Sequence, residues 1–204
     1  MIIFGASGHG KVIYNILIES NDKVSHFFDD NKSLKTFIDK EVTTYDPNYL
    51  KDEELIIAVG NNVNRYQISK RIKHNFGIAI HPSAIISKDV IIERVTVVMH
   101  AAIIQTGSII GKHVIINTAA SVDHDCKIAD LVHISPNSTL CGNVKVGFGS
   151  HIGAGSVINP NITIGKWCII GSGAVIIRDI PDYAIVVGNP GKIIKYNLID
   201  IDEK

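Results

Sequence analysis

The sequence lacks the features that mark membrane proteins, secreted disulfide proteins and proteins that bind polyanions. No apolar run approaches the ~20 residues that span a bilayer, and no basic segment precedes an apolar stretch at the N-terminus. Cys126, Cys141 and Cys168 form no Cys-x-x-Cys pair, and their odd number fits a reducing compartment. The net charge is zero, so neither nucleic acid nor an anionic membrane surface is an expected partner. We therefore expect a cytoplasmic protein.

The first 80 residues contain short apolar segments that alternate with stretches of helical spacing. Strands are predicted at Ile2–Phe4, Val24–Phe28 and Glu54–Gly60, and helices at Lys11–Ser20 and Asn64–Asn75. This alternation implies a parallel sheet with right-handed crossovers. Because there is room for only about half of a two-lobed dinucleotide fold, residues 1–80 are predicted to form a Rossmann-like α/β half-domain.

From residue 86 onward, a period of six residues replaces this pattern. Every sixth position is Ile, Val or Leu, in the series Ile86, Ile92, Val98, Ile104, Ile110, Ile116, Val122, Ile128, Ile134, Leu140, Val146, Ile152, Ile158, Ile164, Ile170 and Ile176. The residue two positions earlier is small or compact with one exception. A period of six fits neither an α-helix nor a flat sheet, but it is typical of a triangular parallel β-helix in which each hexad forms one side.

We therefore predict a hexapeptide-repeat prism over residues 81–195 and a polar tail over residues 196–204. The mean hydropathy of +0.21 is high for a protein without a membrane segment, so apolar residues must be buried within the subunit or between subunits. Glycines that directly follow the aliphatic residue are expected at corners with a positive φ, namely Gly111, Gly147, Gly153, Gly165 and Gly171.

Motifs in both segments resemble one known family. They are Gly5–Gly10, Phe28-Asp29-Asp30, Gly60-Asn61-Asn62, Asn117-Thr118, His124-Asp125-Cys126, His133-Ile134-Ser135 and Gly188-Asn189-Pro190. Over nearly the whole chain, this set is similar to the bacterial sugar acyltransferases of the NeuD/PglD type, which include nucleotide-aminosugar N-acetyltransferases and sialic acid O-acetyltransferases. The resemblance implies a homotrimer of left-handed prisms with acetyl-CoA bound between adjacent prisms. The residue pattern by itself predicts the parallel β-helix, and the left hand and the trimer come from the resemblance.

The glycine-rich segment Gly5–Gly10 lies between the first predicted strand and the first helix, an arrangement that holds a pyrophosphate. A nicotinamide site would need a second lobe that the sequence does not show, and a turn with only a structural role stays an alternative. Acidic and amide residues end the second and third strands, at the edge where ligands bind in such sheets. With the resemblance, these positions predict a site for a nucleotide-linked sugar that comprises Gly8, His9, Gly10, Asp29, Asp30, Asn61 and Asn62. A solvent-facing role for His9 stays open.

Nine histidines are candidates for the base that acetyl transfer requires. Three of them have no motif context and are expected at the surface, a fourth beside a proline is expected to be structural, and two more lie in the prism outside the motif; these are His26, His74, His113, His81, His100 and His151. By resemblance, His124 is the general base and His133 hydrogen-bonds near the thioester carbonyl. A structural role at a corner is the alternative for His124.

Residues around His124 refine this prediction. Asp125 stands where the family pattern for UDP-aminosugar N-acetylation has Glu, which leaves the acceptor open. Neighbours on an extended strand point to opposite faces, so Asp125 orients His124 only if the chain turns a corner there; otherwise the acid comes from another coil or subunit. Gly142 lies eighteen residues after His124 and is expected one coil away, with its N–H as an oxyanion donor. Cys126 is expected to point inward, so no acyl-enzyme is predicted.

Two other functions are alternatives. A metal-dependent hydratase of the γ-carbonic anhydrase type needs three histidines at one interface, and its ligand spacing is absent, so no metal is expected. A prism that only binds and trimerises is the other alternative. The resemblance and the glycine-rich end of the prism predict acetyl-CoA contacts at His133, Gly142, Ala154, Gly171, Gly173 and Lys192. We predict an acetyl-CoA-dependent N-acetyltransferase that acts by direct transfer on a UDP-4-amino-sugar type of acceptor, with O-acetylation of sialic acid or a related sugar as the alternative.

Overall fold

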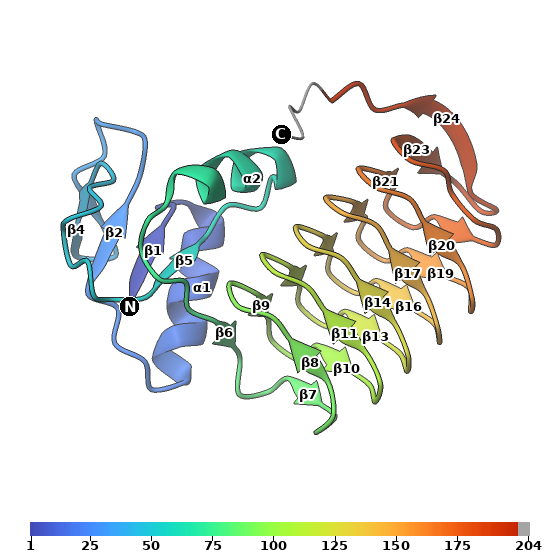
Figure 1. Ribbon diagram of the computed structural model, residues 1–204, viewed down its shortest axis with the longest axis horizontal. Helices are drawn as coiled ribbons and strands as arrows, with labels where there is room; N and C mark the ends of the chain where they lie inside the picture. The colour runs from blue at the N-terminus through green and yellow to red at the C-terminus, as the bar shows by residue number, and fades with distance from the viewer. Residues whose placement is uncertain (200–204) are drawn as a thin grey trace.

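The computed structural model describes residues 1–199 and shows an α/β domain beside the first coils of a long prism (Figure 1). The α/β domain contains β1 (Ile2–Phe4), α1 (Gly8–Glu19), β2 (His26–Phe28), β3 (Thr36–Phe37), β4 (Lys40–Thr43), β5 (Leu55–Ile57) and α2 (Asn62–Arg71). Its sheet has the order β3-β4-β2-β1-β5 and is parallel except for the β3–β4 hairpin. The predicted strands and helices are confirmed, but the hairpin was not predicted because its short segment shows no clear period.

Each coil of the prism adds one short parallel strand to each of three sheets. The six-stranded sheet contains β7 (Ile85–Ile86), β10 (Ile103–Ile104), β13 (Ser121–Val122), β16 (Thr139–Leu140), β19 (Val157–Ile158) and β22 (Val175–Ile176). The five-stranded prism sheet contains β8 (Ile91–Ile92), β11 (Ile109–Ile110), β14 (Lys127–Ile128), β17 (Lys145–Val146) and β20 (Thr163–Ile164). The eight-stranded sheet contains β6 (Ala79–Ile80), β9 (Val97–Val98), β12 (Ile115–Ile116), β15 (His133–Ile134), β18 (His151–Ile152), β21 (Ile169–Ile170), β23 (Ala184–Val187) and β24 (Lys192–Tyr196).

The six-residue period is confirmed by the prism interior. All the aliphatic residues of the series occupy the second place of a strand and form one core, in which only Ile86 and Ile92 of the first coil are partly exposed. The small residues two positions earlier lie in the same interior, and their buried hydroxyls donate to backbone carbonyls: Ser108 Oγ donates to Asp123 O on the next coil at 2.8 Å, and Ser156 Oγ donates to Gly153 O at 2.7 Å. The serine and threonine hydroxyls at these positions therefore have partners, as a dry core requires.

The predicted role of the corner glycines is wrong. Positive φ falls three residues after the interior aliphatic residue, as at Gly107 (+72°), Gly173 (+68°) and also Asp125 (+60°), and not directly after it. The glycines directly after the aliphatic residue, namely Gly111, Gly147, Gly153, Gly165 and Gly171, have no positive φ. A Cβ at Gly147 would lie 2.6 Å from the carbonyl carbon of Gly165, so glycine is required there by close approach of the next coil.

Helix α1 joins the α/β domain to the prism. Its apolar residues Ile13 and Leu17 are buried in one cluster with Ile3 of β1 and with Val97 and Ile115, which point outward from the eight-stranded sheet. The α/β domain therefore covers the outer face of that sheet at the first coils, and the two parts share a hydrophobic core. Over residues 1–199, neither helix has the length and apolar character needed to cross a membrane.

The chain remains ordered beyond the predicted boundary at residue 195. Strand β24 runs to Tyr196, and the N–H of Asn197 donates to the carbonyl of Tyr183 at 2.6 Å. Ile199 packs on a cluster that includes Trp167 of the prism and Tyr66 of α2. The rest of the predicted tail, residues 200–204, lies outside the described part of the chain.

Candidate functional site

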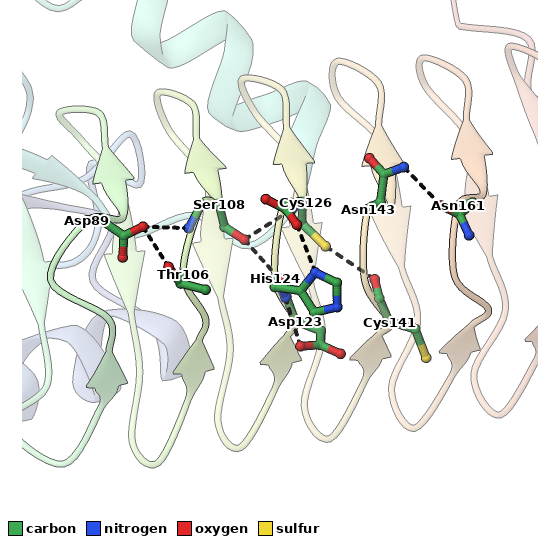
Figure 2. A network of polar contacts seen from close by, with 11 residues as sticks. Asp89, Thr106, Ser108, Asp123, His124, Cys126, Cys141, Asn143 and Asn161 are labelled. Atoms are coloured by element: carbon green, nitrogen blue, oxygen red, sulfur yellow. Dashed lines mark hydrogen bonds and ion pairs between the residues drawn. The ribbon is translucent and has the colours of Figure 1, made fainter.

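His124 lies at the corner where the chain passes from β13 to β14, and the close-up shows it with Asp123 on the outside of the prism (Figure 2). The positive φ of Asp125 turns the backbone at this corner, so its carboxylate reaches the neighbouring ring. Nδ1 of His124 lies 2.8 Å from Oδ2 of Asp125, and both side chains are more than half exposed. The acid that orients His124 is therefore its own neighbour, as the corner alternative required.

The acidic neighbours determine the tautomer and the basicity of His124. Because the Asp125 carboxylate only accepts, Nδ1 carries the proton and Nε2 keeps its lone pair. The hydrogen bond to Asp125, followed by the negative charge of Asp123, raises the pKa of His124 above its ordinary value. Asp123 is itself held in place because its Oδ1 accepts the backbone N–H of His124 at 2.8 Å. The corner therefore presents an oriented imidazole with a free, strengthened basic nitrogen.

Gly142 lies directly against this imidazole on the next coil. A Cβ at Gly142 would lie 2.5 Å from both Cε1 and Nε2 of His124, so only glycine leaves room for the ring in this position. Within residues 1–199, the backbone N–H of Gly142 has no hydrogen-bond acceptor, whereas its carbonyl accepts from Asn161. The predicted stacking of His124 and Gly142 is confirmed, and the backbone of Gly142 lies against the edge of the ring that carries the basic nitrogen.

Cys126, two residues after His124, points into the prism as predicted. It has no exposed surface, and its Sγ donates to the carbonyl of Cys141 at 3.3 Å (Figure 2). Burial raises the pKa of the Cys126 thiol to about 11. A buried thiol with a raised pKa is a poor nucleophile, so the geometry gives no support to a covalent cysteine intermediate.

His133 lies on a different side of the prism from His124. It points outward from β15 in the eight-stranded sheet, whereas the corner that holds His124 joins the other two sheets. In a triangular cross-section, that corner is opposite the eight-stranded side. Within one chain, the two predicted catalytic histidines are therefore not brought together.

Both ring nitrogens of His133 already have partners. Nδ1 lies 3.2 Å from the carbonyl of Gly60, which accepts, so Nδ1 carries the proton. Nε2 lies 3.0 Å from Nδ2 of Asn117, whose Oδ1 accepts the N–H of Thr118. Burial, with smaller effects from His151 and Arg65, lowers the pKa of His133 to about 3. As it stands, this neutral ring has no free N–H to offer a thioester carbonyl.

A cleft of about 510 Å³ lies where β1, β2 and β5 end, and its lining includes the predicted acidic pair. Asp29 is used by the backbone, because its two oxygens accept the N–H groups of Ala6 and Asn31 at 2.8 Å each. Asp30 is exposed and forms an ion pair with Arg71 of α2 across the cleft. Of the two aspartates, Asp30 is therefore the one whose carboxylate is exposed in the cleft, while Asp29 holds the glycine-rich turn against β2.

The two asparagines after β5 also have structural partners. Asn61 is the N-cap of α2, and its Oδ1 accepts the N–H of Asn64 at 2.9 Å. Asn62 is buried, and its amide donates to the carbonyls of Gly149 and Ser150 in the prism while its Oδ1 accepts from Arg65. Two of these bonds tie the α/β domain to the prism and the third lies within α2, so the amide N–H groups of Asn62 are not available to a substrate.

The glycine-rich turn leads directly into α1, which begins at Gly8. A Cβ at Gly10 would lie 2.2 Å from the carbonyl oxygen of Gly5, so glycine is required there, whereas a Cβ at Gly8 would meet nothing. His9 faces the prism rather than solvent: its Nε2 is buried without a partner, and its ring centroid lies 6.5 Å from that of His133. Burial, with a smaller effect from Arg65, lowers the pKa of His9 to about 4.

Several histidines lie where the sequence did not predict them. His151 packs against His133 with ring centroids 4.9 Å apart, although it lies outside the motif. His26 and His74 are buried, and His113 is half-buried, so their predicted surface placement is wrong. A second cavity of about 460 Å³ opens between the start of α2 and the prism, lined in part by Asn61, Val63, His133, His151, Trp167 and Ile169. Apart from Asn61 and His133, no motif marks the residues of this lining, because they meet only when the domain docks.

Four of the residues predicted to contact acetyl-CoA fall at two corners of the prism, whereas His133 lies on the eight-stranded side. Gly142 shares the corner of His124, whereas Ala154, Gly171 and Gly173 lie where the chain passes from the eight-stranded to the six-stranded sheet. Around Gly173, a Cβ would meet no atom within 4 Å, so the backbone there is open. Lys192 begins β24 and is exposed.

One group of side chains in residues 1–199 has the composition of a metal site, namely Glu19, His81 and His100. Nε2 of His81 lies 2.7 Å from Glu19, and Nδ1 accepts the N–H of Ser83 at 3.0 Å. Because Nδ1 accepts, the ring proton is on Nε2 and points to the carboxylate. The hydrogen bonds of His81 therefore account for the short distance between His81 and Glu19. The group lies apart from His124.

Family models match two parts of the chain. The PglD N-terminal domain matches residues 1–72, and the bacterial transferase hexapeptide (six repeats) matches residues 143–178. A UDP-N-acetylbacillosamine N-acetyltransferase from Bacillus subtilis is 43% identical over 109 residues, which cover 48% of this chain and 50% of that protein. The matched part thus spans about half the length of this curated relative.

Solved structures match over nearly the whole chain. A perosamine N-acetyltransferase from Caulobacter crescentus, in complex with CoA and GDP-perosamine, is 34% identical with a TM-score of 0.90, covering 94% of this chain and 95% of that one. The acetyltransferase domain of PglB from Neisseria gonorrhoeae, also solved with acetyl coenzyme A, is 36% identical with a TM-score of 0.87, covering 95% and 98%. With identity at this level over the full length, the chain belongs to the PglD/NeuD-type family of hexapeptide-repeat sugar acyltransferases.

Proposed function

We propose that this protein transfers an acetyl group from acetyl-CoA to the amino group of a nucleotide-linked amino sugar of the UDP-4-amino-sugar type. The observation that carries the proposal is the His124–Asp125 pair beside the N–H of Gly142. The names of the similar proteins support an amino sugar as the acceptor and CoA as the carrier of the acetyl group. The reaction would serve the synthesis of a surface polysaccharide or glycoprotein glycan in the cytoplasm.

His124 has the properties that direct transfer demands of a general base. As the acceptor nitrogen bonds to the thioester carbon, Nε2 of His124 takes the proton that the nitrogen loses. The carbonyl oxygen gains negative charge, which the Gly142 N–H stabilises. The carbon–sulfur bond then breaks, and the proton on Nε2 passes to the departing thiolate of CoA. Asp125 stabilises the imidazolium that exists between these two proton transfers.

The cleft at the end of β1, β2 and β5 is the proposed nucleotide site. Its volume of about 510 Å³ suits a nucleoside diphosphate, and Asp30 offers acceptors for ribose or base hydrogens. The first turn of α1, Gly8 to Gly10, presents free backbone N–H groups to the diphosphate. The unpartnered Nε2 of His9 lies between this turn and the prism, where the sugar would follow. Asn61, at the mouth of the second cavity, keeps its amide N–H groups for the same ligand.

We propose a homotrimer, because within one chain His124 lies on the other side of the prism from the nucleotide domain. The outward residues of the six-stranded sheet carry no charge; they are Ile85, Ile103, Ser121, Thr139, Val157 and Val175. The five-stranded prism sheet instead presents Lys127 and Lys145. An uncharged face suits a second copy of the chain, and His124 lies at its edge, where it can serve the neighbour's nucleotide domain. Acetyl-CoA would lie between the prisms, along Gly142 of one chain and Ala154, Gly171, Gly173 and Lys192 of the next.

The substitution Thr139→Glu is expected to break this assembly. Thr139 points outward from β16 on the uncharged face, and an unpaired charge buried in an interface costs roughly 2–5 kcal/mol. The matched control is Thr163→Glu, which places the same charge on the outward position of β20 in the five-stranded prism sheet. Light scattering should give the mass of one 22.2 kDa chain for Thr139→Glu and of three chains for the wild type and the control. A trimer that survives Thr139→Glu would place the interface elsewhere.

The acceptor is tested by following thiol release from acetyl-CoA with a panel of UDP-4-amino-sugars, GDP-perosamine, CMP-sialic acid and free sialic acid. Turnover with one nucleotide amino sugar is expected, and turnover with sialic acid alone would establish the O-acetylation alternative. Silence across the panel while acetyl-CoA still binds would refute the acceptor class. A hydroxyl is a poorer nucleophile than a neutral amine, so O-transfer should depend more steeply on His124.

A further inference from the structure

A single buried guanidinium lies at the junction of the α/β domain and the prism. Arg65 of α2 is 1% exposed and has no ion pair with a carboxylate among the described residues. Its five N–H groups donate to five oxygens: Nε to His113 O at 3.0 Å, Nη1 to Val59 O at 3.0 Å and Gly60 O at 3.1 Å, and Nη2 to Asn62 Oδ1 at 2.9 Å and Leu131 O at 2.8 Å. Burying a cation without a counter-charge is costly, so a complete set of acceptors is what makes it tolerable.

The acceptors of Arg65 come from both parts of the molecule. Val59 and Gly60 form the turn between β5 and α2, at the edge that holds the proposed nucleotide site. His113 and Leu131 lie at equivalent corners of two successive coils of the prism. The rigid side chain of Arg65 therefore holds the turn of Val59 and Gly60, beside the proposed nucleotide site, at one position along the prism.

The carbonyl of Gly60 connects Arg65 to His133. It accepts from Nη1 of Arg65 at 3.1 Å and lies 3.2 Å from Nδ1 of His133. This contact puts the ring proton on Nδ1, so that Nε2 accepts from the amide of Asn117. We propose that Arg65 is a positioning residue: by holding the Gly60 carbonyl in place, it keeps the His133 ring in one tautomer, and that tautomer orients the amide of Asn117. This inference rests on the proposed function, because it takes the turn at Gly60 to lie beside the proposed nucleotide-sugar site.

The charges around His133 support this role. The titratable groups that act on it are His151 from β18, Arg65 from α2 and His9 from α1, and none of them is an acid. After burial, the positive charge of Arg65 is the next cause that lowers the pKa of both His9 and His151. A cation in this place disfavours a proton on every imidazole of the group, so the histidines stay neutral near pH 7.

The test compares Arg65→Met, which removes the charge and the donors, with Arg65→Lys, which keeps the charge but not the planar fork. Arg94→Met is the control, because Arg94 is exposed and pairs with Glu54 away from this junction. Histidine ring nitrogens are followed by NMR as pH is varied, with His133 assigned from its loss in His133→Gln. Arg65→Met is expected to raise the pKa of His133 by about one unit or more, and Arg65→Lys is expected to add the Nε2–H tautomer.

Kinetics provide the second readout. The KM for the nucleotide sugar is expected to rise about tenfold in Arg65→Lys, with the KM for acetyl-CoA unchanged, because one charge-assisted hydrogen bond to the turn is lost. A purely structural role would lower Tm but leave the titration and tautomer of His133 and the ratio of the two KM values as in the wild type, and that result would overturn the proposal. If Arg65→Met does not fold, the tautomer in Arg65→Lys decides. The NMR measurement uses no substrate, so it stands even if the acceptor panel is silent.

Discussion

Replacing His124 with alanine is expected to lower kcat by about 10²–10⁴-fold, the contribution typical of a positioned general base. The side chain is exposed at a corner and packs on nothing that the fold depends on, so Tm should stay unchanged. His100→Ala is the matched control, because His100 is a half-buried prism histidine that stacks on His81 away from this corner. Steady-state thiol release at saturating acetyl-CoA and acceptor measures the effect. A His124→Ala enzyme that retains most of its kcat would remove His124 from the chemistry.

The pH profile gives an independent check on the same residue. A base works in its neutral form, so kcat/KM falls as pH drops through the pKa of His124. Asp125 and then Asp123 raise that pKa, so the acid limb should lie above 6.5 in the wild type. Asp125→Asn removes the largest cause and is expected to move the limb to lower pH while also lowering the plateau, since the tautomer is no longer held. A limb that does not move would mean that another group titrates.

The substitution Gly142→Ala is expected to reduce kcat by about 10²-fold or more without destabilising the protein. The new Cβ would lie 2.5 Å from Cε1 and Nε2 of His124, and a ring at the end of an exposed side chain can move away at little energetic cost. The displaced ring would no longer lie beside the Gly142 N–H, so base and oxyanion donor would be separated. Measurement of kcat together with Tm distinguishes this from misfolding, which would lower both.

A double-mutant cycle shows whether Gly142 acts only through the ring. If the glycine merely leaves space for His124, adding Gly142→Ala to His124→Ala should cost little more than His124→Ala alone. Because alanine keeps the backbone N–H as an oxyanion donor, a further loss of about tenfold in the double variant would mean that the new Cβ disturbs a second contact of the reaction. Fully additive losses would mean that the two residues act independently, against the geometry of this corner.

The prism was predictable because its period is local. Each hexad forms one side, so a residue such as Val122 is interior by its position in the repeat alone, without knowledge of any distant segment. The corner glycines show the limit of this reasoning. Gly147 is required by the carbonyl of Gly165 on the next coil, an approach that depends on how coils stack rather than on the φ of one residue.

The residues of the candidate site were predictable only where a motif or the fixed length of one coil determined their positions. His124 and Gly142 are eighteen residues apart, one coil, so their contact follows from the repeat. Asn62 was assigned to the substrate because it ends a strand, but its amide is used by Gly149 and Ser150. Hydrogen-bond partners at such separations depend on docking, and a side chain whose donors are already used has none left for a ligand.

The sequence by itself determined the two-part architecture, the interior of the prism and the inward thiol of Cys126, and through the family resemblance it predicted His124 as the reactive imidazole. Only the tertiary structure decided that Asp125 orients His124, that His133 lies on another side of the prism with both nitrogens bonded, and that Arg65 lies among neutral histidines at the junction. The physical reason is how far apart in the sequence the interacting residues lie. Burial by a repeat depends on residues a few positions apart, whereas charge, tautomer and free hydrogen-bonding capacity depend on which distant segments come into contact.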